Sequence, residues 1–481
     1  MRLYNTLSAK KEELAPSSVP LKMFVCGPTV YDDAHIGHAR TYLAFDIIVR
    51  YLRNRGMDVS YLQNITDVDD KIISRAKETE NADPLDFAHS YEASYLKDMS
   101  SLGIDSVSTY ARASEFIPEI VRQIEVLRAK EFAYEIPGDG WYFDVSRFPD
   151  YGKLSGRTAA EAEDSISRID ESIKKRNRAD FCLWKFPANQ EGTVPTSASV
   201  SEKPQIQNGE PLWETPLGLG RPGWHIEDTA ITEKFFGPQY DIHGGGLDIK
   251  FPHHEAEIAQ QEAASGKKPF VRFWLHTGSL LVDGKKMSKS TGNFITISDF
   301  LKTNRPEVLR WITLTHHYRA PLNYTTAVCE QAQKEFVAVE QITEKLEFVS
   351  EKRLEEKPKL VGLTEKTKEK IAAAMDDDFN AALAVAALNE YIAEIQEVLW
   401  KLSKSEARHL SDFLKETLGV FGFKILTPPI PPEITEIATE RELCRANKQF
   451  VQSDTLRNDL LRLGYIIEDT PLGPFLSKLR Q

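Results

Sequence analysis

The sequence predicts an α/β protein: a parallel β-sheet in the first half, followed by a mostly helical second half. Two observations carry this prediction. Near the N-terminus a buried strand, an amphipathic helix and a second strand follow one another, and such a βαβ unit gives a parallel sheet. From Thr326 to Leu418 apolar residues recur at helical spacing, as in AALAVAALNEYIAEIQEVLWKL.

The βαβ unit begins with a strand that ends at Met23–Cys26. A helix is predicted over Ile36–Arg55, and a second strand over Val59–Thr66. Ligands of parallel sheets bind at the carboxyl ends of the strands. Cys26 and Thr66 are both expected at that edge.

The later elements follow from period and composition. Residues 113–136 are helical by period, and residues 138–145, GDGWYFDV, indicate a turn and a strand. The polar stretch Pro187–Pro211 predicts a mobile surface loop. Strand signals return at Gln239–Phe251, and a helix follows from His253. Ser279–Ser298 indicates a strand that runs into a lysine-rich loop, and Thr427–Glu433, TPPIPPE, a stiff linker before a small final module.

Composition excludes several classes of protein. The 481 residues are 41% apolar and 27% charged, which is ordinary for a globular protein, and no apolar run reaches the ~18 residues of a membrane helix. The N-terminus lacks the apolar core of a secretory signal, so we expect a cytoplasmic protein with no membrane partner. The net charge of −12 argues against a basic coat for nucleic acid but allows a local RNA-binding face. Four widely spaced cysteines argue against a disulfide scaffold.

The motif HIGH, His35–His38, lies at the first turn of the predicted helix. Helix N-termini attract anions, two imidazoles add donors, and Gly37 leaves room for a ligand against the backbone. This arrangement suits a polyphosphate. The alternative is a pair of surface histidines.

The motif KMSKS, Lys286–Ser290, is flanked by glycines. A flexible loop with Lys286 and Lys289 can close over phosphates and neutralise developing charge. The alternative is an ordinary solvated loop.

The motif HGGGLD, His243–Asp248, follows a predicted strand. Its glycines, Gly245 among them, permit close approach of a flat base or sugar, and Asp248 could hold ribose hydroxyls. The alternative is a tight turn.

The stretch HHEAE places His253 and Glu257 four residues apart, and His254 and Glu257 three apart. On a helix either pair shares a face and could bind zinc, but two ligands do not make a site. Cys26 is the best-placed third ligand. The spacing leaves open which histidine ligates, and a capped, solvated helix start remains the alternative.

The combination of motifs is more specific than its parts. HIGH followed far later by KMSKS resembles the class I aminoacyl-tRNA synthetases. FVCGPTVYDDAHIGHAR, NITDVDDKI, GRPGWHIE, DIHGGGLD, FPHHEAEIAQ, HYRAPLNY, MDDDFNAALA and SDTLRNDLLRLGYIIEDTPLG resemble the cysteinyl-tRNA synthetase family in particular. The resemblance covers nearly the whole chain and implies a Rossmann-type parallel-sheet catalytic domain. Its implied segments are two catalytic halves at 1–106 and 213–265, a connective insert at 107–212, a KMSKS-bearing linker domain at 266–325, a helical bundle at 326–424 and an anticodon-binding module at 425–481.

The resemblance also implies an activity. The protein would activate L-cysteine with ATP and Mg²⁺ and transfer it to the 3′ end of tRNA(Cys), acting as a monomer with one Zn²⁺ per chain. The implied roles are these: catalysis by His35, His38, Lys286 and Lys289; ATP binding by Gly37, Gly245, Asp248 and Lys289; cysteine binding by Thr66 and Trp224; metal binding by Cys26, His253 and Glu257.

One position departs from the family pattern. The family has a ligand cysteine in GWHIEC, whereas this chain has Asp228. An aspartate oxygen is an acceptable zinc ligand and carries the same formal charge as a thiolate, although it makes the site harder. We therefore hypothesise that Asp228 completes the metal site.

Two other functions compete with this one. A ligase that joins activated cysteine to an amino sugar would share the zinc and ATP sites but would not need the C-terminal 150 residues. A non-catalytic RNA-binding paralogue would not need two intact nucleotide motifs. Cysteine-dependent ATP–pyrophosphate exchange and charging of tRNA separate the three.

Overall fold

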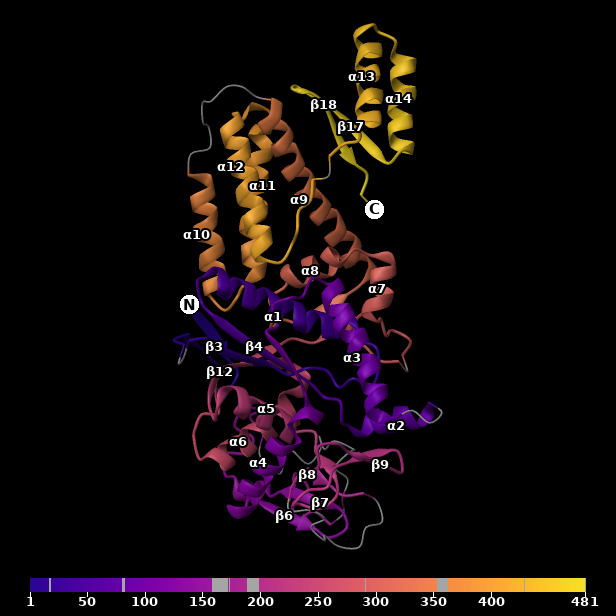
Figure 1. Cartoon of the computed structure of the whole chain (residues 1–481). Helices are drawn as coiled ribbons and strands as arrows, with labels where there is room; N and C mark the ends of the chain where they lie inside the picture. Colours follow the sequence, from indigo (N-terminus) through magenta and orange to yellow (C-terminus); the bar gives the residue numbers. More distant parts are fainter. Residues whose placement is uncertain are drawn as a thin grey trace. The chain divides into compact units, whose positions relative to one another are not determined.

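The computed structural model describes residues 1–16, 19–79, 83–157, 172, 174–187, 199–289, 291–352, 362–427 and 429–480. The chain divides into two compact units (Figure 1). The first consists of Met1–Pro306, His316–Tyr324 and Asp377–Phe379, and the second of Glu307–Thr315, Thr325–Asp376 and Asn380–Gln481.

The first unit is built on a five-stranded sheet in the order β13-β12-β3-β4-β5, with every neighbouring pair parallel. The strands are β3 (Leu21–Val25), β4 (Val59–Ile65), β5 (Thr109–Arg112), β12 (Tyr240–Gly246) and β13 (Val271–Thr277). The three central strands are almost entirely buried, as expected for a parallel sheet covered on both faces. The predicted α/β fold with a parallel sheet is confirmed.

The order of the strands places a topological switch point between β3 and β12. From β3 the chain moves through α1 (Ile36–Asn54) to β4, whereas from β12 it moves the other way through α6 (Glu255–Ser265) to β13. Because crossovers are right-handed, reversing the direction puts the helices on opposite faces. Figure 1 shows α1 and α3 (Pro84–Ser101) on one side of the sheet and α5 (Ile226–Phe236) and α6 on the other. Ligands bind at such a switch point, outside the carboxyl ends of the strands.

An antiparallel sheet in the order β11-β8-β7-β6 follows in the first unit. It contains β6 (Ala133–Ile136), β7 (Gly140–Phe143), β8 (Phe181–Lys185) and β11 (Arg221–Pro222). The prediction of a helix over 113–136 is wrong for its last residues. Helix α4 (Ile117–Ala129) ends where Glu131 adopts a positive φ of 62°, and Ala133–Ile136 pairs with β7 across a turn at Gly138.

The predicted loop Pro187–Pro211 contains a hairpin. Its strands are β9 (Gln205–Gln207) and β10 (Glu210–Leu212), joined by Asn208 and Gly209 with φ values of 54° and 75°. Asn-Gly favours such a two-residue turn because both residues tolerate positive φ. The loop prediction is therefore wrong at its C-terminal end, and residues 188–198 lie outside the described part.

The remaining elements of the first unit flank these two sheets. They are β1 (Arg2–Asn5), β2 (Lys10–Glu13), α2 (Asp70–Glu78), η1 (Ala113–Phe116), η2 (Val145–Arg147), η5 (Leu247–Ile249), the π-helical turn η6 (Lys250–His254), β14 (Leu280–Val282), β15 (Lys285–Lys286), α7 (Ile297–Thr303) and β16 (Leu322–Tyr324).

The second unit is mainly helical, as predicted. Its elements are α8 (Pro306–Leu314), α9 (Thr326–Lys352), α10 (Leu363–Asp376), α11 (Ala381–Val398), η7 (Leu399–Lys401), α12 (Lys404–Val420), α13 (Pro432–Ala446), α14 (Phe450–Arg462), β17 (Tyr465–Thr470) and β18 (Gly473–Lys478). In α11 the buried residues Ala384, Leu388, Tyr391 and Ile395 form one stripe at helical spacing. In α12 a capping box of Ser403 and Glu406 fixes the start.

Three further observations bear on the sequence-based expectations. Strands β5 and β13 belong to the parallel sheet, so the sheet extends past the predicted segment boundaries at residues 106 and 265. The other boundaries stay predictions. All four cysteines are buried, and none of them forms a disulfide. Among the described residues, no helix has the length and apolar character that a membrane span requires.

Candidate active site

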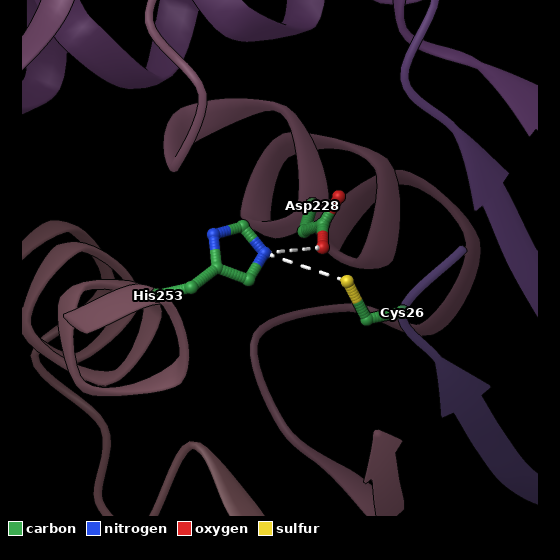
Figure 2. Close-up of side chains that lie close together, drawn as sticks. All are labelled: Cys26, Asp228 and His253. Atoms are coloured by element: carbon green, nitrogen blue, oxygen red, sulfur yellow. Dashed lines mark hydrogen bonds and ion pairs between the residues drawn. The ribbon is translucent and has the colours of Figure 1, made fainter. Parts of the chain in front are cut away.

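Three side chains of residue types that can bind a metal meet near the carboxyl end of β3, and they come from three separate parts of the chain (Figure 2). Cys26 directly follows β3, Asp228 lies in α5, and His253 lies in the π-helical turn before α6. His253 Nε2 is 3.5 Å from Cys26 Sγ and 3.1 Å from Asp228 Oδ2. All three residues are buried, and their donor atoms lie within 4.8 Å of one another. A single cation could contact all three.

Glu257 lies one helical turn after His253. Its Oε1 is 3.2 Å from His253 Nε2, and its Oε2 is 3.4 Å from His243 Nδ1. Neither oxygen has a hydrogen-bond partner among the described residues, although the side chain is fully buried. A buried carboxylate without hydrogen bonds is costly unless a cation compensates it. We call Cys26, Asp228, His253 and Glu257 the metal group.

The protonation of the metal group supports the same interpretation. Burial, together with the charges of Asp228 and Glu257, raises the pKa of the Cys26 thiol well above its usual value. Burial and the charge of Asp228 likewise raise the pKa of Glu257. A bound cation reverses both effects, because it stabilises the thiolate and the carboxylate that bind it. One thiolate, one imidazole and two carboxylates form a donor set compatible with zinc.

The orientation of His253 is set by a residue that the sequence analysis did not single out. His225 Nδ1 lies 2.8 Å from His253 Nδ1, and burial lowers the pKa of His225, which keeps it neutral. A proton on His253 Nδ1 can be donated to His225, which leaves His253 Nε2 free as a ligand. Trp224 stacks on the His253 ring at 4.4 Å between centroids. Partners of this kind fix the tautomer and orientation of metal-binding histidines.

The two neighbouring histidines, which the spacing could not distinguish, have different partners in the structure. His253 faces Cys26 and Asp228, whereas His254 does not. His254 Nδ1 lies 2.9 Å from His276 Nε2, and His254 belongs to a second buried group with His243 and Glu257. Burial lowers the pKa of His243 and of His254, and lowers that of His276 to about 3. The imidazoles of this second group are therefore neutral, and the second group shares Glu257 with the metal group.

The HIGH residues form the N-cap of α1. His35 Nδ1 accepts hydrogen bonds from Gly37 N at 3.1 Å and His38 N at 3.2 Å, and the two imidazoles stack with centroids 3.7 Å apart. Because Nδ1 accepts, the ring proton of His35 is on Nε2. Burial lowers the pKa of His35 to about 4 and lowers that of His38 well below its usual value. Both imidazoles are therefore neutral hydrogen-bond donors at pH 7.

Gly37 lies beside the ring of His35. A Cβ added at Gly37 would lie 2.9 Å from the His35 ring. The missing side chain therefore leaves room for His35, and the expectation that a ligand lies against this backbone stays a prediction. The histidine cap, absent from the usual list of capping residues, could not be read from the sequence.

The KMSKS segment lies against the HIGH segment. Ile36 N donates to Ile295 O at 3.1 Å, and Ile297 N donates to Ala34 O at 2.8 Å. Met287 Sδ accepts from Ile295 N at 3.5 Å. Residues 34–36 thus pair through their backbone with residues 295–297, a few positions after KMSKS. We call HIGH together with residues 286–289 and 291–297 the motif pair.

The lysines of the motif pair are open to solvent. Lys286 is exposed on β15, and the Lys289 side chain is 57% exposed. Lys289 forms an ion pair with Asp32, which lies between β3 and α1. Ser290 lies outside the described residues. The lysines are therefore accessible to an anion at the start of α1.

The glycines of HGGGLD are packed against protein side chains. A Cβ at Gly244 would lie 2.4 Å from the Phe45 ring, and one at Gly245 would lie 2.6 Å from the His254 ring. Gly245 is buried beside the His254 ring, and the expectation that a base or sugar lies against these glycines stays a prediction. Asp248 is exposed beyond the end of β12 and can still reach a ligand.

Thr66 and Trp224 both lie beside the metal group. Thr66 is 2% exposed, and its Oγ1 donates to Glu227 Oε1 at 3.1 Å. Trp224 is partly exposed over His253. Asn64, which the sequence analysis passed over, donates from Nδ2 to Asp228 Oδ1 at 2.6 Å. The only feature of the sequence that points to Asn64 is its position near the end of a predicted strand, two residues before Thr66.

Comparisons with known proteins agree with this geometry. A family model described as tRNA synthetases class I (C) catalytic domain matches residues 13–334, and a DALR domain model matches residues 370–426. A cysteine–tRNA ligase of Thermococcus onnurineus (strain NA1) is 41% identical over 495 residues, covering 100% of this chain and 99% of the relative. A cysteine–tRNA ligase of Caldicellulosiruptor saccharolyticus is 40% identical over 488 residues, covering 100% of both chains.

Solved structures support the fold. The leucyl-tRNA synthetase in a ternary complex from Agrobacterium radiobacter K84 has a TM-score of 0.62 at 12% identity, over 85% of this chain and 84% of that one. The methionyl-tRNA synthetase of Mycobacterium tuberculosis has a TM-score of 0.56 at 17% identity, over 84% and 89%. Fold and motifs together define the class: a class I tRNA synthetase catalytic domain with a DALR domain behind it. Within that class, the chain belongs to the cysteine–tRNA ligase family.

Proposed function

We propose that this chain activates L-cysteine with ATP and Mg²⁺ and transfers the cysteinyl group to the 3′ end of tRNA(Cys), with one Zn²⁺ bound by Cys26, Asp228, His253 and Glu257. The observation that carries the proposal is the buried metal group, whose donor atoms converge at the carboxyl end of β3. Helix α1, with its HIGH cap, starts from the same edge of the sheet. A site for sulfur therefore lies next to a site for phosphate.

In the first step, the carboxylate of cysteine attacks the α-phosphate of ATP, and pyrophosphate leaves. That carboxylate is already ionised at neutral pH, so no protein general base is needed. Positioning and charge stabilisation dominate this kind of transfer. His35 and His38 donate hydrogen bonds from neutral imidazoles, Lys286 and Lys289 neutralise the leaving pyrophosphate, and Asp248 holds the ribose.

In the second step, a hydroxyl at the 3′ end of the tRNA attacks the activated carbonyl. An ester bond forms and AMP leaves. The helical region from about residue 326 onward is proposed to hold the tRNA, with the anticodon read near the C-terminus. A monomeric state and a cytoplasmic location are part of the same proposal.

Selection of cysteine depends on sulfur. When bound, zinc supplies a soft Lewis acid that favours the thiolate of cysteine over the hydroxyl of serine. Shape alone separates such near-isosteres poorly. Thr66 and Trp224 would line the pocket in front of the metal group. The alternative functions are not favoured, because the relatives match the full length of the chain, including the segment that an amino-sugar ligase would not need.

Aminoacylation of total tRNA with cysteine, with and without a zinc chelator, tests the proposal. We expect charging that the chelator abolishes and that added Zn²⁺ restores, with serine far less active in ATP–pyrophosphate exchange. Exchange without tRNA charging would instead indicate the amino-sugar ligase. Absence of both would indicate the non-catalytic paralogue.

A further inference from the structure

Asn64 ties three parts of the site together with one side-chain amide. Its Nδ2 donates to Asp228 Oδ1 at 2.6 Å and lies 3.3 Å from Thr66 Oγ1, while its Oδ1 accepts from Gly27 N at 2.6 Å. Asn64 is 1% exposed. The backbones also approach closely, because a Cβ at Gly27 would lie 1.8 Å from Asn64 O. The position of Asn64 relative to the residue after Cys26 is therefore fixed.

The bond from Asn64 makes the two oxygens of Asp228 unequal. Oδ1 is engaged by Asn64, whereas Oδ2 lies 3.1 Å from His253 Nε2. Figure 2 shows one carboxylate oxygen of Asp228 facing His253 and the other directed away. Only Oδ2 is presented to the space between Cys26 and His253.

This inequality matters because of the residue type at position 228. A thiolate offers one donor atom to a metal, but a carboxylate offers two and can bind through both. A second oxygen on the metal would take a coordination position that the sulfur of the substrate needs. A carboxylate at this place therefore requires something to hold its second oxygen back.

We propose that Asn64 is a positioning residue that restricts Asp228 to a single metal–oxygen contact and so keeps a coordination position open for the sulfur of cysteine. This inference rests on the proposed function, since it requires a bound metal and a cysteine substrate. It assigns Asn64 a specificity role that the aspartate at position 228 creates. The role disappears if position 228 carries a ligand with one donor atom.

A double-mutant cycle tests the inference. The variants are Asn64→Ala, Asp228→Cys and the two combined, each loaded with Zn²⁺ or Co²⁺. The readouts are metal per chain, the visible absorption of the Co²⁺ protein with and without cysteine, and KM and kcat for cysteine in ATP–pyrophosphate exchange. Asn5→Ala is the matched control. Asn5 is another buried asparagine of the first unit, and its Nδ2 donates to Arg272 O at 2.8 Å.

In the Asp228 protein, we expect Asn64→Ala to retain its metal and to raise KM for cysteine about tenfold or more, with a smaller change in kcat. The Co²⁺ bands should weaken before substrate is added, because absorption falls as the coordination number rises, and cysteine should perturb them less. In the Asp228→Cys background the same change should alter KM less than about threefold. Asn5→Ala should leave the spectrum and KM unchanged.

Two results would overturn the inference. One is an Asn64→Ala protein with unchanged KM and unchanged Co²⁺ spectrum. The other is an equal loss of metal and activity in both backgrounds, which would show that Asn64 only supports the fold. Failure of the proposed function looks different, because there the parent protein itself binds no metal or activates no cysteine.

Discussion

The metal group and the motif pair lie near each other but are built in opposite ways. Every member of the metal group is buried, with Cys26 8% exposed and Glu257 fully covered, and each lies on or directly after a strand or helix of the first unit. The motif pair joins two segments through backbone hydrogen bonds but leaves Lys289 57% exposed and paired with Asp32. Under the proposed function, the site for sulfur is therefore assembled before any substrate arrives, whereas the site for phosphate is completed by the substrate.

This comparison has an electrostatic basis. In the metal group, a thiol and carboxylates are held out of water, where they are costly without a cation. In the motif pair, lysines stay hydrated until a polyphosphate replaces their solvent. Loss of a metal-group residue should therefore remove both metal and activity, whereas loss of a lysine should remove activity alone.

The largest expected effect is from Cys26→Ala. Loss of the thiolate should lower metal content severely and reduce cysteine-dependent ATP–pyrophosphate exchange about 100-fold or more, since even outer partners of a metal site change affinity or activity by about 10- to 100-fold. Metal analysis by mass spectrometry and exchange assays measure both. Cys182→Ala, at another buried cysteine of the first unit, is the control and should keep its metal. Full metal occupancy in Cys26→Ala would contradict the assignment of Cys26 to the metal group.

Lys289→Ala should be the next most damaging change. We expect kcat for ATP–pyrophosphate exchange to fall about 100-fold, because a positioned charge that neutralises the leaving group is lost. Metal content should remain that of the parent protein. Lys285 is another exposed lysine of this segment, and Lys285→Ala is the control. It should lower kcat for exchange far less than Lys289→Ala does. Near-normal exchange in Lys289→Ala would contradict its assigned role.

The sequence predicted the parts of this site that depend on local geometry. Strand ends gave the edge at which Cys26 and Thr66 lie, and the i, i+4 spacing put His253 and Glu257 on one face of a helix. Both follow from a period that a sequence displays directly. The helical character of α9 to α12 was readable for the same reason.

The features of the site that the sequence did not predict depend on contacts between segments far apart in the chain. Asn64 meets Asp228 across 164 positions, and the backbone of Ile36 at the start of α1 pairs with that of Ile295. No local period encodes such contacts. The hairpin at Asn208 and Gly209 is a different case, because its turn signal was present in the sequence and was outweighed by the polarity of the surrounding stretch.

A smaller effect is expected at the ion pair between Lys289 and Asp32. A polyphosphate must displace Asp32 before it can engage Lys289, so Asp32→Asn should lower KM for ATP. Exposed ion pairs are worth about 0.2–1 kcal/mol, and the change should accordingly be about twofold. Asp33→Asn is the matched control, since Asp33 Oδ1 accepts a hydrogen bond from Ser94 and does not contact Lys289 among the described residues. A higher KM in Asp32→Asn would mean that Asp32 itself assists ATP binding.

The smallest effect concerns pH and the imidazoles of the motif pair. Burial lowers the pKa of His35 to about 4, below its ordinary value of 6.5, so His35 is neutral throughout the range from pH 6.8 to pH 8. A depressed pKa also means that the stability gained from this buried neutral imidazole is fully present above pH ~6.5 and is lost as the pH falls toward 4.

If neutral His35 donates from Nε2, KM for ATP should stay constant within about twofold between pH 6.8 and pH 8 at saturating Mg²⁺. An imidazolium would predict the opposite, with KM rising about tenfold per pH unit above its pKa, because each unit removes nine-tenths of the cationic form. A rise in KM of that size, absent in His35→Asn, would show that the phosphate site carries a fixed positive charge before the lysines engage. The description of the motif pair as a site that the substrate completes would then be wrong.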